Sequence, residues 1–138
     1  MQQFTLPRTG LPPVQFKGEI MASATDPLPP FPKAKADRRR WHELKLVRHE
    51  DQRLILAIGY RTGVQSEVNI DIVELFDSET AMIDFLTNEY DPTEHMDRLP
   101  EHLRNAASRQ QRMDQRVIDD FEARCSLLLT RAGIVEEI

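Results

Sequence analysis

The chain has 138 residues, a net charge of −5 and one cysteine, and 40% of its residues are hydrophobic. This length suits one domain with a modest core. The sequence has no run of 18 apolar residues and no apolar segment near its beginning. We therefore expect neither a membrane-spanning helix nor a secretory signal. A lone Cys125 cannot form an internal disulfide, and these features together favour a cytoplasmic protein.

Charge is distributed unevenly along the chain. Residues 65–102 contain eleven acidic residues and one base, Arg98, whereas residues 1–40 contain seven bases and three acids. A segment this acidic sets up a local negative field that can steer a basic partner. The alternative interpretation is an ordinary solvated surface.

We expect residues 1–13 to form a flexible arm and residues 14–138 to form a single α+β domain. Alternating residues at 14–22 predict a first strand, which Gly18 weakens. Residues 23–40 predict a loop in which four prolines precede a basic run. This loop either connects two elements or contacts phosphates or an acidic partner. The basic residues are Lys33, Lys35, Arg38, Arg39 and Arg40.

The stretch from His42 to Phe76 carries the only sustained alternation of apolar and polar residues. It predicts three antiparallel strands joined by tight turns at 49–52 and 61–63. With the strand at 14–22, they make a small four-stranded antiparallel sheet. In the last of these strands, Val68, Ile70 and Ile72 are expected to point inward, and Glu67, Asn69 and Asp71 into solvent.

Helices are expected to follow the sheet. A short helix capped by Asp77 or Ser78 would pack on it, and a second would begin at Asp91. Residues 100–132 contain no Gly, and no Pro after Pro100, which predicts one helix about 50 Å long. Because this exceeds the width of a small domain, the helix either kinks near residues 107–111 or pairs with a second chain. We expect a homodimer through Val117, Ile118, Phe121 and Leu128.

Sequence patterns that carry chemistry are lacking. No histidine pair has the spacing of a zinc site, and no glycine-rich phosphate-binding sequence or G-x-S-x-G occurs. Cys125 lies in an apolar helical stretch, which is typical of packing. We expect no enzymatic activity and no catalytic, cofactor-binding or metal-binding residue. A site assembled from residues distant in sequence is the alternative.

These features favour a cytoplasmic protein-binding module that acts as a regulator or inhibitor. Its acidic segment would mimic the phosphates of a nucleic acid toward a basic partner, such as a nucleic-acid-handling defence complex. The expected partner-binding residues are Glu67, Asp71, Glu74, Asp77, Glu79 and Asp84. The alternatives are nucleic-acid binding through residues 33–40 and a structural dimer or assembly subunit. The sequence isoelectric point of about 5.4 disfavours nucleic-acid binding.

Overall fold

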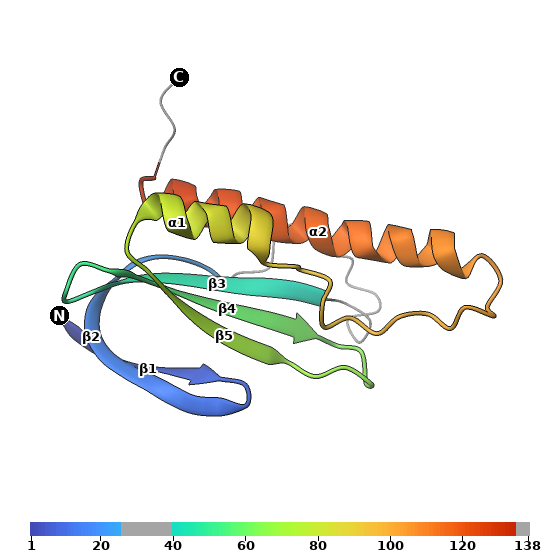
Figure 1. Ribbon diagram of the computed structural model, residues 1–138, viewed down its shortest axis with the longest axis horizontal. Helices are drawn as coiled ribbons and strands as arrows, with labels where there is room; N and C mark the ends of the chain where they lie inside the picture. Colours follow the sequence, from blue (N-terminus) through green and yellow to red (C-terminus); the bar gives the residue numbers. More distant parts are fainter. Residues whose placement is uncertain (26–39, 135–138) are drawn as a thin grey trace, which may run out of the picture.

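The computed structural model of the protein describes residues 1–25 and 40–134. The strands are β1 (Gln2–Arg8), β2 (Leu11–Ala24), β3 (Arg40–His49), β4 (Leu54–Thr62) and β5 (Ile70–Phe76), and the helices are α1 (Glu79–Asp84), the π-helical η2 (Phe85–Glu89) and α2 (Ala106–Arg131). Within the described residues, the strands form one antiparallel sheet in chain order. Helices α1 and α2 cover one face of the sheet, and β1 and β2 curl toward the opposite side (Figure 1). The prediction of an α+β chain with an antiparallel sheet and a long C-terminal helix is confirmed.

The alternation between His42 and Phe76 corresponds to β3, β4 and β5. Leu44 lies opposite Ile58, and Leu46 opposite Leu56, so their side chains line the face of the sheet that the helices cover. None of the four is more than 1% exposed. The turn between β3 and β4 places Gln52 at a φ of 79°, in the left-handed region that tight hairpin turns use.

The expectation of a flexible arm at residues 1–13 is wrong, because this segment supplies β1 and the beginning of β2. Phe4 and Leu6 are buried on the face of the sheet that points away from the helices. They pack there on apolar residues of β3 and β4 and form a second, smaller core. The described residues therefore contain a five-stranded sheet, where the sequence predicted four strands.

The sheet curls so far that its two outer strands meet at one point. The Thr9 N–H, just after β1, donates to the Asp71 carbonyl of β5 at 2.9 Å. In return, the Asp71 N–H donates to the Thr9 hydroxyl at 2.7 Å. The first and last strands thus come together without forming a regular ladder, which gives the sheet the shape of an open barrel.

The segment between η2 and α2 is less helical than the sequence predicts. Asp91 does not begin a helix: its carboxylate accepts hydrogen bonds from the N–H and hydroxyl of Thr93, which closes a local turn instead. Helix α2 begins at Ala106 and not at Pro100, because Asn105 adopts a left-handed φ of 57°. Its 26 residues span about 39 Å at 1.5 Å per residue.

Helix α2 packs along the sheet of its own chain, mainly on β2 and β3. Val117, Phe121 and Leu128 are at most 4% exposed, and Ile118 is half-buried. Three of the four residues expected to join two chains are therefore already covered within one chain. The dimer was inferred from a helix too long for its domain, and the shorter helix removes that reason.

Part of the predicted organisation lies outside the described residues. The loop at 23–40 falls there except for its two ends, and so do Lys33, Lys35, Arg38 and Arg39. In the part of the chain that the structure describes, no helix is long and apolar enough to cross a membrane.

Candidate functional site

Glu67, expected at a partner interface, lies inside the protein and accepts hydrogen bonds from four residues. Arg40 binds both carboxylate oxygens at 2.5–3.0 Å. The hydroxyls of Tyr60 and Thr62 donate at 2.7 and 2.9 Å, and the Asp97 N–H donates at 2.9 Å. We call these five residues the Glu67 cluster. It ties the ends of β3 and β4 to the segment that leads into α2.

The Glu67 cluster holds its carboxylate charged. Burial alone would raise the pKa of Glu67, but the hydrogen bonds from Arg40, Tyr60, the Asp97 backbone and Thr62 outweigh it and lower the pKa to about 2. The Glu67 side chain is 0% exposed and the Arg40 side chain 10% exposed. Glu67 therefore stabilises the fold from inside and does not present its charge to a partner.

The prediction that Glu67 points into solvent is wrong for a structural reason. Alternation that begins at residue 67 places Val68 inward and Glu67 outward. Strand β5 begins only at Ile70, so the preceding residues belong to a loop in which alternation does not apply. The observed exposures are the reverse of the prediction: 8% for Glu67 and 66% for Val68.

A second polar group, His42, is buried where α2 crosses β3. Its ring packs on Phe121 with centroids 4.8 Å apart, and its Nε2 lies 2.8 Å from the Tyr90 hydroxyl. Burial, followed by the Coulombic effects of Arg124 and His95, lowers the pKa of His42 to about 3. The imidazole is therefore neutral at pH 7, and it joins the sheet to α2 and to the end of η2.

The buried imidazole predicts a loss of stability in mild acid. In the unfolded chain the pKa of His42 returns to about 6.5, so unfolding takes up a proton as the pH falls below that value. Between pH 7 and pH 5.5 this costs the native protein about 1 kcal/mol. In urea unfolding, His42→Gln should lack this part of the pH dependence, whereas substitution of the exposed His102 by Gln should keep it. Identical pH profiles for the native protein and His42→Gln would contradict the assignment.

Arg124 is a buried charge that the sequence did not reveal. It is 0% exposed, and it donates to Asp120 one turn earlier on α2 and to the Ala24 carbonyl at the end of β2, both at 3.3 Å.

The neighbouring Cys125 packs against the main core. Burial, and to a lesser extent the charge of Glu122, raises the pKa of the Cys125 thiol to about 12, so it is protonated at pH 7.

The remaining predicted interface residues separate into two groups. Asp71 is half-buried and forms a salt bridge with Arg61 at 2.7 Å, and Glu74 is also half-buried on β5. Asp77, Glu79 and Asp84 are exposed. The acidic side chains around α1 are thus more exposed than those of β5.

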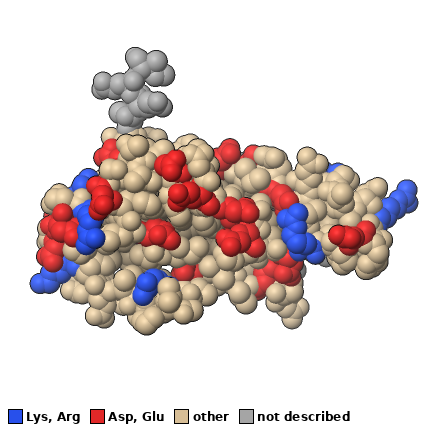
Figure 2. Space-filling view, viewed as in Figure 1, with Lys and Arg blue, Asp and Glu red and all other residues tan. Residues whose placement is uncertain are grey.

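Exposed acids continue beyond α1 into the segment that leads to α2. Among residues 77–101 every acidic residue is exposed, and Arg98 is the single base in that range. Figure 2 shows acidic atoms over α1 and the following segment, with few basic atoms between them. We call this region the acidic surface: Asp77, Glu79, Asp84, Glu89, Asp91, Glu94, Asp97 and Glu101.

The charges of the acidic surface are largely uncompensated within the described chain. Arg98 pairs instead with Asp114 of α2 at 3.0 Å. Among the residues that the structure describes, no Lys or Arg forms a salt bridge with any member of the acidic surface. The mutual repulsion of these carboxylates is a cost that a basic partner would relieve.

None of the protein-family models, curated proteins or solved structures compared with the chain matches it.

Proposed function

We propose that this protein is a non-catalytic protein-binding module that regulates or inhibits a basic partner through its acidic surface. The observation that carries the proposal is the run of exposed carboxylates from Asp77 to Glu101, none of which forms a salt bridge with a described Lys or Arg. Complementary charge accelerates encounter and selects partners, and these effects require only exposed side chains in a fixed arrangement. The curled sheet and α1 provide that fixed arrangement.

The narrower form of the proposal is that the acidic surface stands in for nucleic-acid phosphates. A partner that handles nucleic acid, such as a cytoplasmic defence complex, carries a basic groove whose affinity for phosphates falls with salt. A protein that occupies such a groove should compete with the nucleic acid and show the same salt dependence.

The alternative of nucleic-acid binding through the basic segment 33–40 is less well supported. Of its five basic residues, Arg40 lies in the described part of the chain, and its guanidinium is bound to Glu67. The hydrogen bond to Glu67 is also the main reason that the pKa of Arg40 is raised. Arg40 therefore stabilises the fold, and its guanidinium is not available to bind phosphates.

Charge reversal on the acidic surface tests the proposal. In Asp77→Lys/Glu79→Lys/Glu89→Lys, three exposed acids whose side chains form no hydrogen bond among the described residues become basic. We expect this variant to lose at least about tenfold of its affinity for a partner captured from lysate, since close interfacial charge pairs contribute about 1.5 kcal/mol or more each. The readout is quantitative mass spectrometry of captured proteins, with added duplex DNA as the competitor.

The matched control makes the same charge change elsewhere. Glu19, Glu50 and Glu122 are exposed acids outside the acidic surface, and reversing all three should leave capture unchanged. Circular dichroism of both variants verifies that each is folded, because Lys at the first turn of α1 weakens the helix slightly. Equal capture by the native protein and both variants would show that the acidic surface is not the interface.

A further inference from the structure

The face of the sheet that points away from the helices is not completely filled. Where β1 and β2 curl over β3, β4 and β5, they leave a groove of about 320 Å³. This volume is at the lower end of the range for small-molecule sites, about 300–1,000 Å³. The groove exists because the first and last strands meet at Thr9 and Asp71 and do not pair elsewhere as a ladder.

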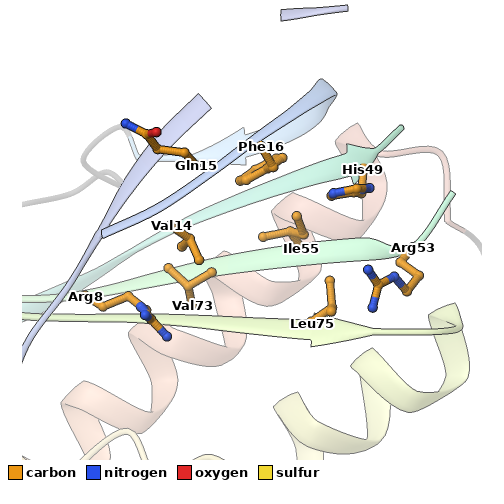
Figure 3. Close-up of a pocket in the computed structure, with 9 residues that line it drawn as sticks. All are labelled: Arg8, Val14, Gln15, Phe16, His49, Arg53, Ile55, Val73 and Leu75. Carbon is orange, nitrogen blue, oxygen red and sulfur yellow. The ribbon is translucent and has the colours of Figure 1, made fainter. Parts of the chain in front are cut away.

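The middle of the groove is apolar. Side chains from β2, β4 and β5 converge on it in Figure 3: Val14, Phe16, Ile55, Val73 and Leu75. Ile55 is buried, whereas Leu75 is 47% exposed on the last strand. Apolar surface left in contact with water in this way favours an apolar occupant, because covering it removes apolar area from water.

Basic side chains lie at both ends of the groove. Arg8 lies at one end, and His49 and Arg53 lie at the other (Figure 3). No carboxylate is among the described residues that line the groove, although the chain as a whole has a net charge of −5. An apolar channel with basic ends fits a ligand that combines an apolar body with an acidic group.

The two arginines differ in how far their charge is already neutralised. The Arg53 guanidinium binds Asp51 at 2.6–2.7 Å, and its hydrogen bond is the main reason that the pKa of Asp51 is lowered to about 2. Arg8 instead donates from Nε to the Pro12 carbonyl at 2.8 Å, which orients the side chain without neutralising it. Among the described residues, no carboxylate forms a salt bridge with Arg8.

We propose that this groove binds a small amphipathic carboxylate, an apolar chain or ring with one acid group, whose carboxylate pairs with Arg8. A planar guanidinium fits a carboxylate with two parallel hydrogen bonds, and the apolar middle of the groove covers the body of the ligand. The groove and the acidic surface involve different residues. A negative result for this site would therefore not contradict the protein-binding function proposed above, and a negative result for that function would not contradict this site.

Decanoate is a suitable probe, because it joins a flexible apolar chain to one carboxylate and stays monomeric at millimolar concentration. We expect saturable NMR shifts of the groove residues with a Kd of about 1 mM or below. Decanol, which has the same chain without the charge, should bind at least about tenfold more weakly. Equal binding of decanol would overturn the role of the carboxylate, and absence of saturable shifts would overturn the site.

Variants locate the ligand within the groove. Arg8→Gln should weaken decanoate binding about tenfold, the loss expected for one charge-assisted contact. Arg53→Gln should have a smaller effect, because Asp51 already pairs with that side chain. The control is Lys17→Gln, which removes an exposed base of β2 outside the groove. Equal affinities for the Arg8 and Lys17 variants would contradict the proposal.

Filling the groove gives a second test that does not depend on charge. Val73→Phe places a larger side chain in the apolar middle and should abolish decanoate binding while the thermal unfolding transition is retained. Binding that survives in a folded Val73→Phe protein would place the ligand elsewhere. Shifts of groove residues that depend on protein concentration, without added ligand, would assign the groove to a second copy of the chain and overturn the small-ligand proposal.

Discussion

Glu67→Ala should destabilise the protein by about 3–5 kcal/mol, the cost of removing one partner from a buried ion pair. The substitution leaves the Arg40 guanidinium, which is nearly covered, without its acceptor. It also removes the acceptor of the Tyr60 and Thr62 hydroxyls and of the Asp97 N–H. Arg40, Tyr60 and Thr62 lie on the paired ends of β3 and β4, so the Glu67 carboxylate joins those ends to the segment at Asp97, which lies outside the sheet. Urea unfolding at pH 7 measures the loss.

The control for this prediction is Glu89→Ala, which removes an exposed acid of η2 and should change stability by less than about 0.5 kcal/mol. The pH profile provides a further check. The pKa of Glu67 is about 2 in the folded protein, below its ordinary value of 4.5. Its contribution is therefore present above pH 4.5 and is lost as the pH falls through 2. A Glu67→Ala protein as stable as Glu89→Ala at pH 7 would contradict the role of the cluster.

Phe121→Ala should cost about 3–5 kcal/mol, as is usual for truncating a buried aromatic side chain. Phe121 is 2% exposed and lies between His42 and Tyr90, with ring centroids 4.8 and 5.0 Å away. Truncation opens a cavity where α2 meets the sheet. Chemical unfolding measures the loss, and the next residue supplies the control, because Glu122 is exposed and Glu122→Ala removes no core contact.

The same variant distinguishes packing within one chain from pairing between chains. If Phe121 packs only on its own sheet, light scattering should give the chain mass of 16.0 kDa for both the native protein and Phe121→Ala. The unfolding midpoint should then be independent of protein concentration. A native mass of twice that value, lost in Phe121→Ala, would restore the dimer expected from the sequence.

The sequence predicted the centre of the sheet well, because the apolar residues of β3, β4 and β5 that lie under the helices recur at every second position. This environment imposes a period of two, which Leu54, Leu56 and Ile58 display. The short helix was also predictable, since Ser78 caps it by accepting a hydrogen bond from the Ala81 N–H. In both cases the signal is local and lies within one element.

The predictions failed where structure depends on contacts between distant segments. Strand β1 has only two buried residues, Phe4 and Leu6. This pattern is too short to distinguish a strand from a flexible, proline-containing arm. Arg124 occupies a position on α2 that faces the sheet, but its charge conceals it from a search for apolar residues. Its carbonyl acceptor at Ala24 lies 100 residues earlier in the chain, so no local pattern indicates the contact.

The candidate sites also contain some residues whose exposure follows from the local sequence and others whose burial depends on distant segments. Exposure of Asp77, Glu79 and Asp84 follows from their places at and within a short amphipathic helix. The burial of Glu67 depends on the approach of Arg40 and Asp97, which are 27 and 30 residues away. The groove depends on how far the sheet curls, because Arg8 of β1 and Arg53 of the turn before β4 come to its two ends. Sequence periodicity does not encode curvature of this kind.

The position of α2 has a consequence for how the chain folds during synthesis. Arg124 and Arg131 of α2 bind backbone carbonyls of β2 that lie 100 and 108 residues earlier, and Leu128 completes the main core. The strands leave the ribosome first, with the face that α2 will cover still open to water. Contacts this distant in sequence form slowly. The main core of the nascent sheet is therefore incomplete until residues up to Leu128 have been synthesised. During that interval, its apolar face is available to chaperones.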